Sequence, residues 1–174
     1  MSATVEIRPA READIAAVTG IYAYHVSHGL ATFEIEPPSL AEMTRRYQAL
    51  TSKGYPYFVA TLNDVVRGYA YAGSYRDRPG YRHTVENSVY VEHTHVGRGI
   101  GRLLLDAVIR QSEELGYRQM LAVIGDSANI ASIRLHEQCG FTLTGTFRAV
   151  GHKHGRWVDT VLMQRALGLG DAPI

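Results

Sequence analysis

The stretch that decides the fold runs from residue 88 to residue 105 and reads Ser88-Val89-Tyr90-Val91-Glu92-His93-Thr94-His95-Val96-Gly97-Arg98-Gly99-Ile100-Gly101-Arg102-Leu103-Leu104-Leu105. Its β-branched start predicts an extended strand, its alternate glycines predict a tight turn, and its leucines predict an amphipathic helix. Glycine lets the backbone approach a ligand closely, and a helix start presents unpaired N–H groups and a partial positive charge. The combination predicts a site for a pyrophosphate group.

Two other nucleotide-binding motifs do not match this glycine turn. A P-loop needs Lys-Ser or Lys-Thr after its last glycine, where this chain has Arg102-Leu103. A dinucleotide fingerprint lies on the first strand of its domain, whereas these glycines follow several predicted strands. A turn that serves only the packing of a helix on a strand remains the alternative. We favour a cofactor that carries a pyrophosphate and needs no Mg²⁺ clamp.

The composition predicts a single domain over residues 1–174 with a small-molecule partner. Eighteen Lys and Arg against seventeen Asp and Glu give a net charge of +1, and no basic block indicates a nucleic-acid partner. The lone cysteine, Cys139, excludes an internal disulfide framework and is expected to be a small packed residue. No apolar run approaches the ~20 residues of a membrane span, and a secretory signal is lacking. We therefore expect a cytoplasmic protein without membrane contacts.

The hydrophobic patterns predict the element order β-α-α-β-β-β-α-β-α-β-β. Asp14 is expected to cap the first helix and Ser39 the second, with Glu42 three residues after Ser39. Asn63-Asp64 is expected to form a hairpin turn. The tail 168–174 is expected to fray. The predicted strands are 5–8, 55–62, 65–75, 84–91, 119–124, 141–150 and 157–165, and the last three helices are 39–50, 99–115 and 129–138.

The central stretch, together with Asn129-x-x-Ser132-x-x-x-His136-Glu137-x-x-Gly140-Phe141, resembles the Gcn5-related N-acetyltransferase superfamily. Residues 96–101 take the place of the Q/R-x-x-G-x-G/A turn that holds the coenzyme A pyrophosphate in that family. Val96 departs from the usual Gln or Arg, which weakens one side-chain contact and leaves the backbone N–H groups. The resemblance implies an α/β fold with a mixed, mostly antiparallel sheet, splayed central strands and helices on both faces. It also implies acetyl-CoA as cosubstrate, bound by Val89, Tyr90, Val91, Gly97, Arg98, Gly99, Ile100, Gly101, Arg102, Asn129 and Ser132.

A closer resemblance, spread over nearly the whole chain, is to the phosphinothricin acetyltransferase family. Its members acetylate the α-amino group of L-phosphinothricin or of methionine sulfoximine or methionine sulfone, and the resemblance suggests a homodimer. His152 differs locally from the family pattern. The segments that carry the resemblance are Thr32-Phe33-Glu34, Arg78-Pro79-Gly80-Tyr81-Arg82, Thr84-Val85-Glu86-Asn87-Ser88-Val89-Tyr90-Val91, Ala122-Val123-Ile124-Gly125 and Lys153-His154-Gly155-Arg156-Trp157-Val158-Asp159.

Glu86 is the expected catalytic base. Acetyl transfer needs a neutral amine, and an α-amino group of pKa ~8 or higher is mostly protonated at pH 7. One carboxylate, acting directly or through water, is enough to remove that proton. Glu86 lies on the strand that leads into the glycine turn, although an exposed strand acid without a role is the alternative.

His136 stands where many superfamily members have a tyrosine that protonates the leaving thiolate. It is expected to donate that proton, or else only to orient the cofactor or pack behind the helix. By resemblance, Arg78 and Tyr81 bind the anionic groups of the substrate and Phe33 walls its methylene part; a solvated loop charge is the alternative for Arg78. The pairs His93-x-His95 and His152-x-His154 lack a third ligand type, so no metal site is expected.

Two functional alternatives stay open. The same fold could acetylate another amine, such as a peptide N-terminus or a polyamine. A non-catalytic sensor of acetyl-CoA would bind the cosubstrate and release no coenzyme A, and in it Glu86 would be a structural acid.

Overall fold

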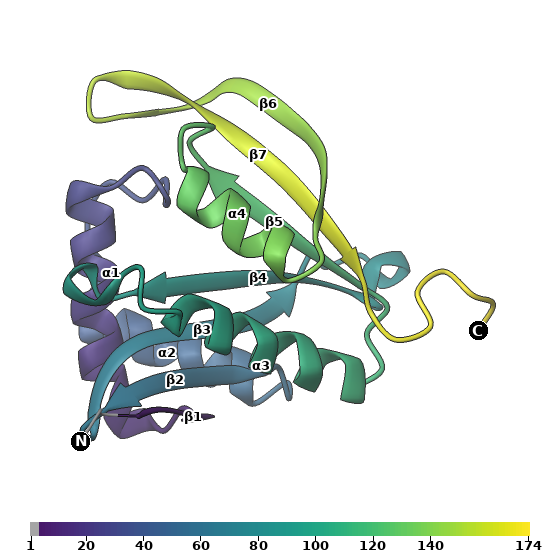
Figure 1. Ribbon diagram of the computed structural model, residues 1–174, viewed down its shortest axis with the longest axis horizontal. Helices are drawn as coiled ribbons and strands as arrows, with labels where there is room; N and C mark the ends of the chain where they lie inside the picture. The colour runs from purple at the N-terminus through teal and green to yellow at the C-terminus, as the bar shows by residue number, and fades with distance from the viewer. Residues whose placement is uncertain (1–3) are drawn as a thin grey trace.

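A seven-stranded sheet forms the centre of the computed structural model, which describes residues 4–174 (Figure 1). The strand order is β1-β2-β3-β4-β5-β7-β6, and all neighbours are antiparallel except β4 and β5, which are parallel. The predicted element order and the mixed, mostly antiparallel sheet are confirmed. The strands are β1 (Val5–Pro9), β2 (Tyr57–Leu62), β3 (Val65–Ser74), β4 (Thr84–Val91), β5 (Gln119–Gly125), β6 (Thr142–Lys153) and β7 (Arg156–Ala166), and the helices are α1 (Ile15–His28), α2 (Leu40–Thr51), α3 (Ile100–Glu114) and α4 (Ile130–Gln138).

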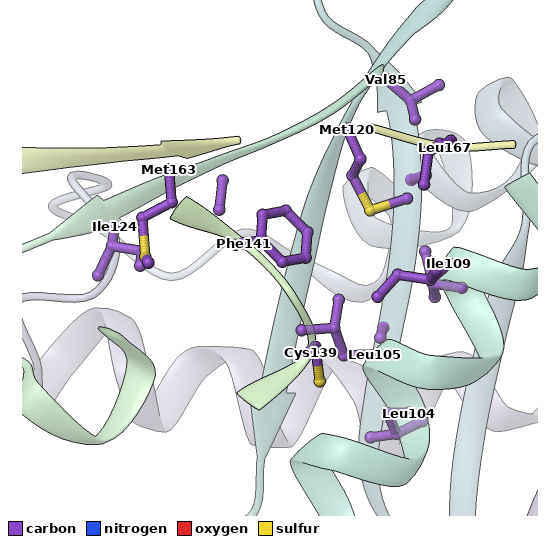
Figure 2. Packing of buried hydrophobic residues seen from close by; sticks show 14 of the residues in the cluster. Val85, Leu104, Leu105, Ile109, Met120, Ile124, Cys139, Phe141, Met163 and Leu167 are labelled. Atoms are coloured by element: carbon purple, nitrogen blue, oxygen red, sulfur yellow. The ribbon is translucent and has the colours of Figure 1, made fainter. Parts of the chain in front are cut away.

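The helices cover both faces of the sheet, because side chains alternate between the faces along each strand. On β3, Ala70 and Ala72 belong to the core cluster that contains the buried side of α3, whereas Tyr69 belongs to the cluster beneath α1 and α2. Small alanines let α3 approach closely, and the tyrosine fills the wider space on the other face. Figure 2 shows the α3 side of the core, where Phe141 and Leu105 pack beside Cys139. Cys139 is buried as expected, and burial raises the pKa of its thiol to about 11.

The central strands β4 and β5 separate along their length, as predicted. Thr84 to Asn87 pair with Gln119 to Ala122. Beyond that point β4 continues to pair with β3, and β5 continues to pair with β7. Within residues 4–174, no ladder joins the last four residues of β4 to β5. The sheet therefore opens in its middle at Asn87.

Most local signals predicted from the sequence are confirmed. The Ser39 hydroxyl accepts a hydrogen bond from the Glu42 N–H (3.2 Å) and caps α2. Asn63 and Asp64 both have positive φ (51° and 62°), as a tight hairpin turn between twisted strands requires. α3 begins directly after Gly99, whose φ is 79°.

Three local predictions are wrong. Asp14 does not cap α1 with its side chain; its carboxylate accepts instead from Arg8 (2.7 and 2.8 Å) and from the Arg11 N–H (2.7 Å). β6 extends to Lys153, three residues beyond its predicted end, because the hairpin turns at His154-Gly155. The tail is anchored as far as Ala172, since the Arg118 guanidinium donates to the carbonyls of Gly170 (2.7 Å) and Ala172 (2.6 Å).

Candidate active site

A narrow cleft lies where β4 and β5 part, with a volume of about 50 Å³. One wall comes from β4, one from β5, and α4 and the loop before α2 close its ends. Strand backbone that faces this cleft can accept an extended ligand in the way that a sheet edge accepts an added strand. The residues that line it are Ala31, Asn87, Ser88, Val89, Tyr90, Ala122, Val123, Ile124, Gly125, Asn129, Ser132 and His136.

The glycine turn lies between the end of β4 and α3. Gly97 and Gly99 have φ of 77° and 79°, and a β-carbon on either would meet open space, so backbone conformation alone selects glycine there. Arg98 between them is exposed. The first N–H groups of α3 have no intrahelical partner by geometry and face the turn. The turn therefore has the properties of an anion-binding helix start.

The third glycine of the turn has a different role. A β-carbon at Gly101 would lie 3.3 Å from Cδ2 of Leu135, so the absence of a side chain lets α3 and α4 approach. The Arg102 side chain projects outward, and its Nε lies 3.8 Å from Oδ2 of Asp106. α4 is capped by Asn129, whose side-chain oxygen accepts from the Ser132 N–H (3.3 Å). Both α4 residues predicted to bind the cofactor thus reach the cleft, although the Asn129 oxygen already serves the helix.

The end of β4 is tied to α1. The His25 Nε2–H donates to the carbonyl of Val91 (2.8 Å), and burial lowers the pKa of His25, which keeps the ring neutral at pH 7. Val89 and Tyr90 line the cleft. Because the Val91 carbonyl already accepts a hydrogen bond from His25, a cofactor that contacts this carbonyl would have to share it with the His25 ring.

His136 and Asn87 form a buried polar pair at the cleft. The His136 ring, 4% exposed, places Nδ1 2.8 Å from the Ser132 carbonyl and Nε2 3.0 Å from Oδ1 of Asn87. The Asn87 amide donates to the Leu121 carbonyl (3.1 Å), which fixes the direction of its oxygen. Two acceptors therefore face the ring and favour protonation of both nitrogens, whereas burial lowers the pKa of His136 and opposes that form. The ring is therefore fixed in place between α4 and β4.

Glu86 faces a larger cavity of about 410 Å³ on the opposite face of β4 from Asn87. It is half-buried, and burial raises the pKa of its carboxyl above the ordinary value. Arg46, at the rim, is bonded to Glu34 (2.6 Å) and Glu42 (2.7 Å). A carboxylate with a raised pKa beside a cavity is placed to take a proton from a bound cation. The cavity is lined by Arg45, Arg46, Ala49, Leu50, Lys53, Tyr55, Tyr71, Gly73, Ser74, Glu86 and Ser88.

The three residues predicted to bind the substrate lie outside both cavities in the described part of the chain. Phe33 lies against β6, where a β-carbon on Gly151 would overlap its ring. Arg78 precedes the 3-10 turn Pro79–Tyr81 and is exposed. Tyr81 meets Tyr75 edge to face, with ring centroids 5.4 Å apart. Their predicted contacts with substrate stay predictions.

Asn87 is a site residue that the sequence analysis missed. A signal was present, since Asn87 alternates with Val85, Val89 and Val91 on the face of β4 that packs in the core. An amide on such a face needs a polar partner. Its partner, His136, is 49 positions away, and local patterns do not show that distance in space.

Between residues 4 and 174, no group of three or more His, Cys, Asp or Glu is arranged to hold a metal ion. In the same range, none of the helices combines the length and apolar character that crossing a membrane requires.

Comparison with known proteins bears on this geometry. Residues 7–162 match the family described as acetyltransferase (GNAT) domain. The chain is 46% identical to phosphinothricin N-acetyltransferase of Alcaligenes faecalis over 168 residues, which cover 97% of this chain and 85% of that protein. It is 43% identical to the L-methionine sulfoximine/L-methionine sulfone acetyltransferase of Salmonella typhimurium, with 96% and 97% of the two chains covered. Among solved structures, the phosphinothricin acetyltransferase of Sinorhizobium meliloti in complex with acetyl-CoA superposes with a TM-score of 0.95 at 46% identity, covering 98% of this chain and 92% of that one.

Proposed function

We propose that this chain uses acetyl-CoA to acetylate the α-amino group of a small amino-acid analogue. The chain is an N-acetyltransferase of the GNAT family, and within that family it belongs to the phosphinothricin and methionine sulfoximine acetyltransferases. L-phosphinothricin, methionine sulfoximine and methionine sulfone are the proposed acceptors. The observation that carries the proposal is the opening of the sheet directly after Asn87, the residue next to Glu86. It places a cleft for an extended thioester arm beside a cavity that contains a carboxylate of raised pKa.

The residues present are suited to hold acetyl-CoA. When bound, this cosubstrate supplies an acetyl group activated as a thioester. Gly97, Gly99 and the N–H groups at the start of α3 would hold its pyrophosphate, because the turn leaves open space where side chains would stand. The strand backbone of Val89 and Tyr90 would pair with its extended arm.

Glu86 would take the proton from the acceptor ammonium, which leaves a neutral amine to attack the acetyl carbonyl. Its position in the lining of the larger cavity and its raised pKa both suit this step. An N–H of the opened β4 strand would stabilise the negative charge that develops on the carbonyl oxygen. Positioning of the two reactants supplies most of the rate enhancement. No covalent acyl-enzyme is needed in this scheme.

His136 would return a proton to the leaving thiolate. Its Nε2 lies 3.0 Å from Oδ1 of the cleft residue Asn87, so a proton on that nitrogen would lie on the cleft side of the ring. A thiolate whose conjugate acid has a pKa of ~8.5 needs only modest help to leave. Loss of His136 should therefore slow the reaction without abolishing it.

A homodimer is the proposed assembly. The β6–β7 hairpin carries exposed apolar side chains, among them Phe147 (56% exposed), Val150 (57%) and Trp157 (67%). Figure 1 shows this hairpin along one edge of the molecule. Exposed apolar side chains gathered on one element are typical of a protein–protein interface. Light scattering coupled to size-exclusion chromatography tests the assembly, and a mass of one chain at micromolar concentration would contradict it.

The chain is proposed to act as one domain, because the sheet runs through every strand from β1 to β7. The cytoplasm, where acetyl-CoA is available, stays the predicted location. Expression of the chain in a sensitive bacterium is expected to confer resistance to phosphinothricin, and growth on selective medium measures it.

The deciding experiment follows thiol release from acetyl-CoA with each candidate acceptor offered separately. L-phosphinothricin, methionine sulfoximine and methionine sulfone are the expected substrates, and spermidine and a short peptide represent the other amines. Turnover of the amino-acid analogues that Glu86→Gln removes would support the proposal. Faster turnover of spermidine or the peptide would reassign the acceptor, and acetyl-CoA binding without release for any amine would indicate a sensor.

A further inference from the structure

Lys153 is a buried lysine that the proposed reaction does not use. It ends β6, its side chain is 1% exposed, and its ammonium donates a hydrogen bond to the carbonyl of Thr32 (2.7 Å). Among residues 4–174, no carboxylate lies within ion-pair distance of its Nζ. Burial lowers the pKa of Lys153, and the charge of Glu34 opposes that shift only in part.

Stability alone does not account for this residue. Removing an ammonium group from water costs several kcal/mol, roughly, and one carbonyl acceptor returns little of that cost. A methionine of similar volume would fill the same space at lower cost. The reason for a lysine must therefore lie in what its hydrogen bond holds in place.

The bond holds residues 30–34, which we call the crossing segment. The Thr32 hydroxyl is also hydrogen-bonded to the Tyr22 hydroxyl (2.8 Å), so side chains from α1 and β6 both hold Thr32 in place. The Phe33 ring lies on the bare backbone of Gly151, two residues before Lys153. Glu34 ends the segment in its ion pair with Arg46 of α2 (2.6 Å).

The crossing segment joins the two cavities of the proposed active site. Ala31 lines the cleft between β4 and β5, and the carbonyl of Leu30 passes so close to Gly125 at the end of β5 that a side chain there would collide with it. At the other end, Arg46 lines the cavity that contains Glu86. Any shift of Thr32 would therefore move a wall of the cleft and the rim of the acceptor cavity together.

We propose that Lys153 is a positioning residue for acetyl transfer, and that its hydrogen bond to Thr32 holds the crossing segment where the acceptor amine can meet the thioester. The inference rests on the proposed function for its kinetic consequence, whereas its structural part, the immobilisation of residues 30–34, does not.

Lys153→Met is the decisive change, because it keeps the volume and removes the ammonium. We expect kcat/KM for the acceptor to fall about 10- to 100-fold, as a displacement near 1 Å causes elsewhere. The KM for acetyl-CoA should change less, because its pyrophosphate is held by the glycine turn. The midpoint of thermal unfolding should stay within about 3 °C of the wild type, since the lost bond and the relieved burial of charge offset each other. Amide hydrogen exchange of the crossing segment should become faster.

Thr144→Val is the matched control. It also removes a hydrogen bond from a β6 side chain to a backbone carbonyl, that of Leu162 (3.0 Å), and lies at the other end of the strand. It should leave both exchange and acceptor kinetics unchanged. Tyr22→Phe, which removes the second contact to Thr32, should share the effect of Lys153→Met, and the double variant should be less than additive. Tyr22→Phe also keeps the test available if Lys153→Met does not fold.

The outcomes separate this inference from the proposed function. Unchanged exchange of residues 30–34 in Lys153→Met would overturn the inference whatever the acceptor. Faster exchange with unchanged acceptor kinetics in an active enzyme would also overturn it. If the wild type acetylates none of the amines, the proposed function fails, while faster exchange in the variant would still support the positioning of the segment.

Discussion

Replacement of Glu86 by glutamine tests the proposed chemistry most directly. The variant keeps the shape of the side chain and removes its charge and its ability to accept a proton. At pH 7 an amine of pKa about 8 to 9 is neutral in roughly one molecule in 10 to one in 100. General-base catalysis contributes about 10²- to 10⁴-fold in enzymes. We therefore expect kcat/KM for the acceptor to fall by about 10² to 10⁴ at pH 7, measured by thiol release.

The loss should depend on pH, because a neutral amine needs no base. In Glu86→Gln, log kcat/KM should rise by about one for each pH unit up to the pKa of the amine. The wild type should reach its plateau at lower pH. The difference between the two enzymes should thus be largest near neutral pH and shrink above pH ~9.

The stability of the same variant has a predicted sign. Burial raises the pKa of Glu86, so the folded state binds the proton more tightly than the unfolded state. The charged carboxylate therefore costs stability as the pH rises from the ordinary glutamate pKa through the raised folded value. Glu86→Gln lacks this cost and should be at least as stable as the wild type at pH 7. A slow enzyme that is equally stable has lost chemistry and not structure.

Glu114→Gln, at the exposed end of α3, is the control for loss of one carboxylate. It should keep wild-type kinetics at every pH. If Glu86→Gln retained more than about a tenth of the activity at pH 7 with an unchanged pH profile, Glu86 would not be the base.

Three other changes have defined outcomes. Gly99→Ala places a side chain on a residue in the left-handed conformation, which costs about 1–2 kcal/mol. Calorimetry should therefore find acetyl-CoA bound about 10-fold more weakly. Equal affinity would argue against the glycine turn as the phosphate site. His136→Gln should lower kcat by about 10-fold or less, since a thiolate of pKa ~8.5 leaves readily, and complete inactivity would give this residue a larger role. Asp14→Asn breaks the contacts to Arg8 and Arg11 and should lower the unfolding free energy by about 2 kcal/mol at pH 7. The hydrogen bond from Arg8 lowers the pKa of Asp14 despite the burial of its carboxylate. The difference in unfolding free energy between the two proteins should therefore be present above the unfolded pKa of ~4 and vanish as the pH falls through the lower folded value. A difference that does not depend on pH would contradict the ion pair.

The elements that the sequence predicted well are those fixed by near neighbours. The Ser39 cap, the Asn63-Asp64 turn and the Gly99 helix start each depend on residues within one turn of chain. Backbone conformation and local hydrogen bonds decide them, and both can be inferred from residue types. Glu86 belongs to the same class, because its place on β4 follows from the strand pattern that leads into the glycine turn.

The elements that sequence patterns missed depend on contacts between distant segments. Lys153 lies beyond the predicted end of its strand at residue 150, and its burial follows only from the passage of Thr32 across β6. Asp14 has the residue type of a helix cap, but Arg8 on the neighbouring strand offers a charged partner and takes the carboxylate. A charge-assisted bond of this kind is stronger than a cap to a neutral N–H group. Tertiary context thus overrode a correct local signal.

The open centre of the sheet joins these long-range contacts to function. Parting two central strands leaves backbone groups without ladder partners, which a protein interior tolerates only when other groups serve them. Here side chains take over: Asn87 donates to the Leu121 carbonyl, and His25 donates to the Val91 carbonyl. His136 in turn fixes Asn87 from α4. Because these side chains serve carbonyls at the two rims, the strand backbone of Val89 and Tyr90 is left for a ligand, and His136, which fixes Asn87, lies at the same cleft.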